Sequence, residues 1–397
     1  SPGWVGPRAS CAEVVGEFVA QQESLDAAQD SLPALDLLYF LHVPRTAGRT
    51  FNFCFLKQSY PVRDRCERAY DHLRLDPHHV DCRFLSSHDD WSLVGRMEGR
   101  PRVVTQLRDP VDRALSAYEF VVEVASRAAK ASNDTVRPGR IKTDDVWPWS
   151  VLVPWMRGYM AERRAAMAAA EGGEGEAWDG SHEASAHPWV MPLSRFVREP
   201  VVRDLVFNGQ LFQLLGVTNN TSWDAGQAMA VRRCAAEGGE AAGLLLDLAK
   251  SRLRGRLDAV TVKETLETSV ELAAAMLNLS LLGPGYTPKV QQRQHNLGNM
   301  YKRCVEAQTR KSAARRKAAL ESLRFPDDHP FTFDREAVPE HVMQELRLVN
   351  ALDSQLHREA QEVMEEEVYR SRDEGRWVTV EEALQADDEA EGEGEGG

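Results

Sequence analysis

A short cationic loop near the start of the chain has residue types that suit the binding of an anion. The apolar run Leu35–Val43 comes first, and Arg45, Gly48, Arg49 and Thr50 follow it. Such a run is typical of a buried parallel strand, and the glycine lets the loop backbone approach a ligand closely. A helix that begins after the loop adds N–H groups that favour an anion. The pattern therefore predicts a site for phosphate or sulfate.

The loop departs from the G-x-x-x-x-G-K-[ST] motif of proteins that bind nucleoside triphosphates. Val43 stands where that motif has its first glycine, and Arg49 stands where it has its lysine. Both differences disfavour a kinase or an ATPase, and we therefore keep an ATP-binding P-loop protein only as a remote alternative. We expect the helix after the loop to cover Thr50–Lys57.

A second passage from strand to helix carries Arg108 and Ser116. The apolar run Arg102–Leu107 precedes them, and Asp109 is the expected N-cap of the helix that follows. Arg108 and Ser116 lie two helical turns apart along one line, where they could grip a second phosphate. The plain alternative is an ion pair between Arg108 and Asp112.

His88 follows a third short apolar run, Arg83–Ser87, and precedes Asp89, Asp90 and Trp91. A neutral imidazole can accept the proton of an attacking hydroxyl group, because its pKa lies near that of the solution. A histidine that only bonds nearby backbone is the alternative.

Arg45, His88 and Arg108 each come just past an expected strand. Ligands of an open parallel sheet bind at the carboxyl ends of its strands, so we expect these three side chains at one edge. The fold class that follows is α/β, with a central parallel β-sheet flanked by helices.

These patterns resemble the paired signatures of the sulfotransferases that use 3′-phosphoadenosine 5′-phosphosulfate (PAPS), which have a P-loop-like sulfotransferase fold. The segment at His88 is similar to the His-x-Asp-Trp segment of the heparan sulfate 6-O-sulfotransferases, in which the histidine is the catalytic base. Other segments resemble the tyrosylprotein sulfotransferases of plants and green algae: Thr50–Lys57, Tyr118–Phe120, Trp147–Trp149, Leu152–Arg157 and Gly216–Asn220.

The resemblance implies a role for each candidate site residue. His88 is the base, and Arg45 steadies the leaving phosphate oxygen. Arg108 and Ser116 hold the 3′-phosphate of the donor. The loop that holds the 5′-phosphosulfate consists of Arg45, Thr46, Ala47, Gly48, Arg49, Thr50 and Phe51. PAPS is then a co-substrate, PAP (the same nucleotide without the sulfuryl group) is a product, and no metal is required.

The function implied is transfer of a sulfuryl group to tyrosine hydroxyls of secreted peptides or proteins that carry acidic residues near the tyrosine. Transfer to a glycan, of the heparan 6-O type, is the nearest alternative, because a primary alcohol needs the same base. An inactive binding module is a third possibility. The joint presence of His88, Arg45, Arg108 and Ser116 disfavours it.

The chain has 397 residues and a net charge of −13, and eight of its acidic residues lie after Val380. Without those eight the net charge would be −5, which gives no basis for nucleic-acid binding. We expect an N-terminal helical segment (1–34), a catalytic domain (35–370) with a flexible insertion at about 165–188, and an acidic, disordered C-terminal linker (371–397).

The cysteines and glycosylation triplets fit a secretory compartment. Six cysteines allow fifteen complete pairings, of which Cys66–Cys82 is the most plausible local bridge. The absence of C-x-x-C disfavours a zinc site. N-x-[ST] triplets begin at Asn133, Asn219, Asn220 and Asn278. No apolar stretch reaches the ~20 residues of a membrane helix. The resemblance implies a Golgi-luminal enzyme, and we expect this chain to be a soluble fragment separated from its anchor.

Three further segments carry structural expectations. The basic cluster Arg310–Lys317 is typical of a solvated helix face, although it could also attract an acidic peptide or close over the donor. Pro339–Tyr369 is predicted to form one long helix. The pair Asn219-Asn220 suits either a structural turn or the acceptor site, and Cys54 is expected to be a small buried residue.

Overall fold

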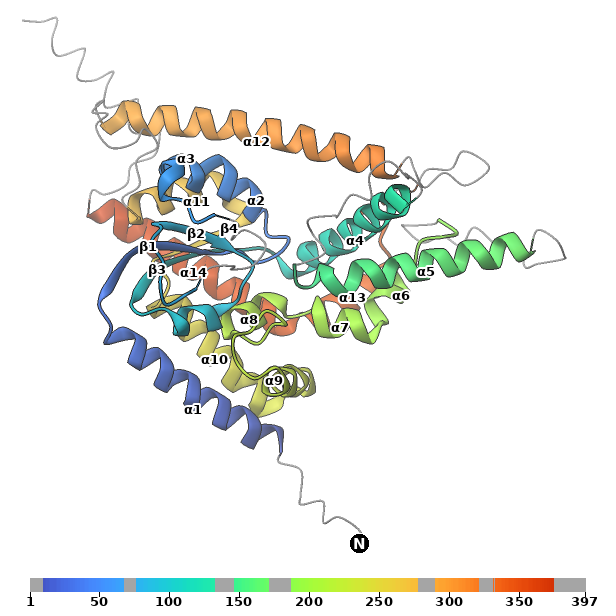
Figure 1. Ribbon diagram of the computed structural model, residues 1–397, viewed down its shortest axis with the longest axis horizontal. Coiled ribbons are helices and arrows are strands. Elements are labelled where there is room, and N and C mark those ends of the chain that lie inside the picture. The colour runs from blue at the N-terminus through green and yellow to red at the C-terminus, as the bar shows by residue number, and fades with distance from the viewer. Residues whose placement is uncertain are drawn as a thin grey trace, which may run out of the picture.

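A parallel β-sheet lies at the centre of the molecule, with helices on both of its faces (Figure 1). The computed structural model describes residues 10–67, 76–132, 146–170, 187–277, 290–320, 331 and 333–374. The four strands are β1 (Ala34–Leu41), β2 (Phe84–Ser87), β3 (Arg100–Leu107) and β4 (Ala259–Val262), in the order β2-β1-β3-β4. The α/β prediction is confirmed.

The helices of the described residues connect and cover these strands. They are α1 (Cys11–Asp30), α2 (Gly48–Phe51), α3 (Lys57–Ser59), α4 (Pro110–Ser132), α5 (Trp149–Ala170), α6 (Leu193–Arg198), α7 (Pro200–Leu205), α8 (Gly209–Leu215), α9 (Ala225–Glu237), α10 (Gly239–Gly255), α11 (Leu266–Met276), α12 (Val290–Leu320), α13 (Glu340–Val349) and α14 (Ala351–Asp373). One π-helix, η1 (Asn52–Leu56), lies between α2 and α3, and the 3-10 helices are η2 (Val62–Asp64), η3 (Trp91–Arg96) and η4 (Lys263–Thr265).

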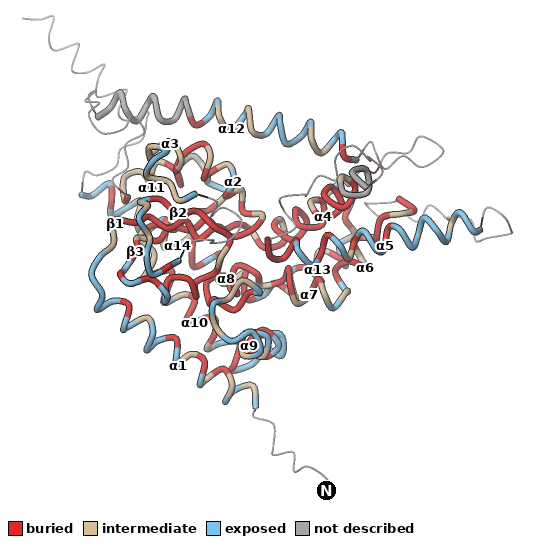
Figure 2. Tube along the Cα trace, in the orientation of Figure 1, coloured by how far each residue is buried: buried red, intermediate tan, exposed pale blue. Residues whose placement is uncertain are grey.

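The central position of β1 explains its unbroken apolar sequence. β1 pairs with β2 on one side and β3 on the other, and Leu37–Leu41 are all buried (Figure 2). Side chains alternate between the two faces of a strand, so a strand covered on both faces needs apolar residues throughout. The three strands expected from the sequence are present. β4 was missed, because its four residues lie between two helical patterns.

A second apolar core lies beside the sheet, among α4, α5, α6, α7 and α13. Tyr118 stands near its centre, where its hydroxyl donates to the Met191 carbonyl at 2.7 Å and its ring meets that of Phe196. Trp147 and Trp149 are buried in the same core. These aromatic residues therefore hold α4 in place, and α4 carries Ser116 and Glu119 toward the sheet edge.

Three disulfide bonds link distant parts of the chain. Cys66–Cys82 closes a local loop, as predicted. Cys11–Cys234 joins α1 to α9, and Cys54–Cys304 joins η1 to α12. Cys54 is buried, as expected, and it is also disulfide-bonded, which spacing alone could not reveal because its partner lies 250 residues away.

The segment predicted as one long helix is broken at Asn350, so that α13 and α14 are separate. Asn350 is fully buried with φ −108° and ψ 24°, and its Oδ1 accepts from the Asn208 N–H at 3.2 Å. Asn208 in turn accepts from the Asp353 N–H at 3.1 Å. These tertiary hydrogen bonds outweigh the continuous helical pattern.

Two predicted segments extend into parts that the structure leaves undescribed. α5 continues to Ala170, so residues 165–170 of the insertion expected at about 165–188 are helical, and residues 171–186 lie outside the described residues. Likewise α14 continues to Asp373, and residues 375–397 of the acidic segment lie outside them. Among the helices that can be examined, none combines the length and apolar character needed to cross a bilayer.

Candidate active site

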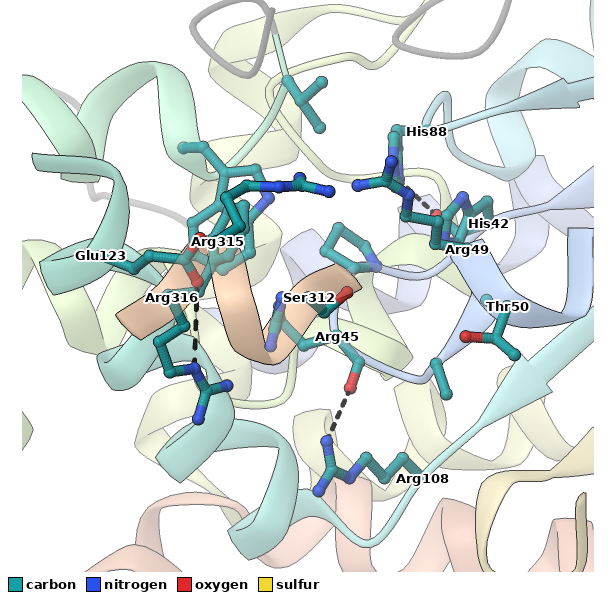
Figure 3. Close-up of a pocket in the computed structure, with 16 residues that line it drawn as sticks. His42, Arg45, Arg49, Thr50, His88, Arg108, Glu123, Ser312, Arg315 and Arg316 are labelled. Atoms are coloured by element: carbon teal, nitrogen blue, oxygen red, sulfur yellow. Dashed lines mark hydrogen bonds and ion pairs between the residues drawn. The ribbon is translucent and has the colours of Figure 1, made fainter. Parts of the chain in front are cut away.

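A pocket of about 310 Å³ opens at the carboxyl ends of the strands. Arg45, His88 and Arg108 all line it, so the structure brings together the three side chains whose positions after β1, β2 and β3 predicted this meeting. Figure 3 shows them around one space, with Ser312, Arg315 and Arg316 of α12 on its other side.

The loop after β1 holds an unusual backbone shape at the pocket wall. Arg45 and Ala47 have φ values of 70° and 64°, in the left-handed region that side-chain-bearing residues seldom adopt. Thr46 between them is fully buried. Its hydroxyl donates to the Val43 carbonyl at 2.9 Å, and its own carbonyl accepts from Gln106 at 2.5 Å. The fold therefore imposes this conformation through buried hydrogen bonds, as is typical of functional loops.

The predicted phosphosulfate loop contains residues that line the pocket and residues that support the loop from behind. Arg45, Ala47, Gly48, Arg49 and Thr50 line the pocket, whereas Thr46 and Phe51 do not. Phe51 is fully buried, and its ring lies 5.4 Å from that of Phe40. Phe51 therefore anchors α2 to the core. The helix expected over Thr50–Lys57 is present as α2, η1 and α3, with a π turn at its centre.

Arg45 is held between an aromatic ring and a hydroxyl group. Its guanidinium lies 4.5 Å from the centre of the Phe120 ring, and its Nε and Nη2 donate to Ser116 Oγ at 3.0 and 2.7 Å. Burial lowers the pKa of Arg45 to about 10, and the charges of Arg108 and Arg316 act in the same direction. The side chain therefore stays cationic at neutral pH, and a bound anion would compensate its burial.

Arg108 and Ser116, predicted to act as a pair, are not bonded to each other. Ser116 Oγ accepts from Arg45 and does not line the pocket. Arg108 Nη2 lies 3.0 Å from Asp112 Oδ2, which is the ion pair considered as an alternative, and Nη1 donates to the Arg45 carbonyl at 3.3 Å. Both residues thus contact Arg45. Ser116 accepts from the Arg45 guanidinium, and Arg108 donates to the Arg45 carbonyl.

His88 is buried at the pocket as a neutral ring, and its pKa lies below the near-neutral value expected from the sequence. Its Nδ1 lies 2.8 Å from the His42 carbonyl oxygen. A carbonyl can only accept, so Nδ1 carries the hydrogen and the lone pair of the neutral ring is on Nε2. Burial lowers the pKa of His88 to about 4, against a smaller opposing effect of this hydrogen bond. The ring is therefore neutral at pH 7.

The backbone at His88 is fixed by side chains from α8 and from the turn that follows it. Gln213 and Asn220 both donate to the His88 carbonyl, at 2.9 and 3.3 Å. Asn219 accepts from Arg232 at 3.2 Å. Asn220 therefore supports the His88 loop and Asn219 bonds α9, and both contacts fit the structural one of the two roles considered for this pair.

The basic cluster on α12 has two sides. Arg315 and Arg316 line the pocket with Ser312, whereas Arg310 and Lys311 are exposed. Arg316 Nη1 lies 3.1 Å from Glu119 of α4, which also accepts from Arg335 at 2.5 Å. Together with Cys54–Cys304, this ion pair attaches α12 across the pocket.

Sequence reasoning did not assign several residues that line the pocket. They are His42, Pro44, Phe120, Glu123, Val146, Trp149, Ser312, Arg315 and Arg316. The segments Tyr118–Phe120 and Trp147–Trp149 and the basic cluster were the available signals, but none of them gives the direction in which a side chain points.

Arginine dominates the charge of this pocket. Among the described residues that line it, five are arginines (Arg45, Arg49, Arg108, Arg315 and Arg316) and Glu123 is the single carboxylate. Within the same described part of the chain, no cluster of His, Cys, Asp and Glu side chains has the arrangement of a metal site. The pocket thus combines a neutral imidazole with cations suited to an anionic ligand.

No model of a known protein family matches the chain. A protein-tyrosine sulfotransferase of Arabidopsis thaliana is 36% identical to it over 251 residues, which cover 61% of this chain and 49% of that protein. This similarity supports a relationship of the chain to the tyrosylprotein sulfotransferase family. The resemblance inferred from the motifs is therefore confirmed, and the chain spans about half the length of the curated relative that it matches.

Proposed function

We propose that this chain transfers a sulfuryl group from PAPS to the hydroxyl groups of tyrosine residues in secreted peptides or proteins. The observation that carries the proposal is the meeting of a neutral, buried His88 with five arginines in one pocket at the sheet edge. The similarity to a protein named for tyrosine sulfation favours tyrosine over a glycan as the acceptor.

The reaction proposed is a direct in-line displacement. The tyrosine oxygen forms a bond to sulfur as the bond from sulfur to the donor phosphate oxygen breaks. The phenolic proton passes to Nε2 of His88, and PAP leaves with the negative charge. Arg45 stabilises this charge electrostatically, because a guanidinium with a pKa of about 10 keeps its proton at neutral pH. No metal takes part in this proposal.

Donor binding is proposed for the loop from Arg45 to Phe51, in which Thr46 and Phe51 set the backbone shape. We assign the 3′-phosphate to Arg108, which would exchange its contact with Asp112 for the phosphate. Ser116 contributes by orienting Arg45. Arg315 and Arg316 extend the cationic wall on the α12 side.

The cellular setting follows from the same proposal. We place the enzyme in the Golgi lumen, attached to the membrane by a segment outside this chain, with residues 35–370 as the catalytic domain. An acceptor with acidic residues near its tyrosine would complement the exposed Arg310 and Lys311 beside the pocket.

The test is sulfate transfer from labelled PAPS to an Asp-Tyr peptide and, in parallel, to desulfated heparan. We expect transfer to the peptide, and His88→Ala should lower kcat about 100-fold or more while the Kd for PAP changes little. His341→Ala, at an exposed histidine, is the control that keeps the rate. Transfer to heparan alone would overturn the acceptor, and a fully active His88→Ala enzyme would overturn the mechanism.

A further inference from the structure

A second imidazole, that of His42, lies against the ring of His88. The two ring centres are 4.0 Å apart and the planes differ by 28°. The ring of Phe40 also stacks with that of His42, at 5.0 Å between centres and an angle of 16°. His42 is 3% exposed, and the proposed reaction assigns it no proton, phosphate or sulfuryl contact.

The backbone of His42 bonds to the same short segment. Its carbonyl oxygen accepts from His88 Nδ1 at 2.8 Å, and its N–H donates to the Ser87 carbonyl at 3.1 Å. These bonds continue the pairing of β1 with β2 past the last paired residues. The orientation of the His88 ring is therefore set by His42 at two places, one on its edge and one on its face.

Gly48 belongs to the proposed donor loop, Arg45–Phe51, and it packs closely against the ring of His42. A Cβ atom at position 48 would lie 2.4 Å from Cδ2 and 2.5 Å from Nε2 of the His42 ring. Real Cβ atoms do not approach other atoms so closely, so only glycine leaves room for the ring. Gly48, His42 and His88 are therefore packed in series from the donor loop to the base.

We propose that His42 is a positioning residue for the base, and that its ring transmits the position of the donor loop to the imidazole of His88. This inference rests on the proposed function. Burial lowers the pKa of His42 well below its usual value, and the neighbouring His88 and Arg49 disfavour its protonated form further. His42 is thus a neutral ring at working pH, and its contribution is shape and stacking.

Two substitutions of similar size separate stacking from simple filling of space. His42→Phe keeps a flat ring, whereas His42→Leu keeps bulk without one. We expect His42→Leu to lower kcat about 10-fold or more with less than about 2-fold change in the Kd for PAP, and His42→Phe to recover most of kcat. His357→Leu is the matched control, because His357 is also buried, pairs with Glu264 and does not line the pocket.

A double-mutant cycle tests the link to the donor loop. Gly48→Ala should lower kcat in the wild-type background, because the added Cβ displaces the His42 ring. In a His42→Ala background the ring is gone, so Gly48→Ala should add much less than its own single effect. Additive losses in kcat would overturn the coupling between the loop and the base.

A spectroscopic readout keeps this inference separate from the proposed function. In ¹⁵N-labelled protein, His88 should show the Nδ1–H tautomer, and His42→Leu should mix the two tautomers while His42→Phe should not. Equal spectra and equal kcat for Leu and Phe would overturn the inference and leave sulfate transfer intact. A wild-type enzyme without transfer to any acceptor would overturn the function, while the tautomer experiment would still decide the role of His42.

Discussion

At the scale of single residues, the pocket depends on burying groups whose charge state matters. His88 and Arg45 were predicted from sequence because each follows an apolar strand that ends at the ligand-binding edge. The partner of Ser116 was not predicted, because the helical spacing gives its face but not the direction from which Arg45 reaches it. His42 gave no signal, because a histidine at the end of an apolar run is indistinguishable from a core residue.

The burial of His88 predicts an unusual acid limit for the reaction. With a pKa of about 4, His88 stays neutral down to about pH 5, so we expect kcat/KM to stay level from about pH 8 to 5 and to fall below that. An ordinary histidine would already lose half of its basic form near pH 6.5. The measurement is kcat/KM against pH with PAP binding followed in parallel, and a midpoint near 6.5 would contradict the prediction.

The same shift has a consequence for folding stability. Between about pH 6.5 and 4 the unfolded chain binds a proton at this histidine and the folded protein does not, so the free energy of unfolding falls as pH drops through this window. His88→Gln should lose less stability than wild type between pH 7 and 5. Urea unfolding at both pH values measures the difference, and equal losses in the two proteins would argue against a depressed pKa.

Ser116→Ala removes the hydroxyl that orients the Arg45 guanidinium. We expect the Kd for PAP to rise about 5-fold or more, because Arg45 then loses the two hydrogen bonds that fix its position. Calorimetric titration with PAP provides the measurement. Ser126→Ala, at another buried serine of α4 that bonds only the Val122 carbonyl, is the control and should leave the Kd unchanged.

At the scale of elements, local patterns predicted three strands but not how the later helices are placed. β4 and the break at Asn350 depend on contacts with residues far away in the sequence, among them Asn208. The basic cluster of α12 suited either a solvated face or a place over the donor, and the sequence could not decide between them, because the approach of α12 to the pocket depends on Glu119 and Cys54 on other elements.

Glu119→Gln tests how α12 is held over the pocket. The amide loses the charge that binds Arg316 and Arg335, so we expect weaker PAP binding and faster proteolysis within α12. Glu345→Gln is closely matched, because Glu345 also binds two arginines, Arg198 and Arg203, at a distance from the pocket. Similar behaviour of both variants would mean that Glu119 has no particular role at the site.

At the scale of the whole molecule, two long-range disulfide bonds attach peripheral helices to helical segments far away in the sequence. Cys11–Cys234 joins α1 to α9. Cys54–Cys304 joins α12 to η1, which directly follows the proposed donor loop in the sequence. Neither pairing could be chosen from the sequence. Each closes a loop of more than 200 residues, and loss of such a bond typically costs about 2–5 kcal/mol.

The two bonds should differ in what they contribute. The double variant Cys54→Ala with Cys304→Ala should lower both the melting temperature and the affinity for PAP, since α12 carries Arg315 and Arg316. Cys11→Ala with Cys234→Ala should lower the melting temperature and leave the affinity for PAP unchanged. Thermal unfolding and PAP titration of both variants give the comparison, and unchanged PAP affinity in the first would separate α12 from donor binding.

The position of α12 late in the chain also determines the order in which the two walls of the pocket are synthesised. The donor loop leaves the ribosome early, but the arginines that face it and the cysteine that fastens them follow only after most of the catalytic sequence, 250 residues beyond Cys54. A growing or prematurely ended chain therefore has a loop without its facing wall. Because a disulfide bond forms only under oxidising conditions, we expect the wall of α12 to be fastened only after synthesis of this helix and oxidation of Cys54 and Cys304.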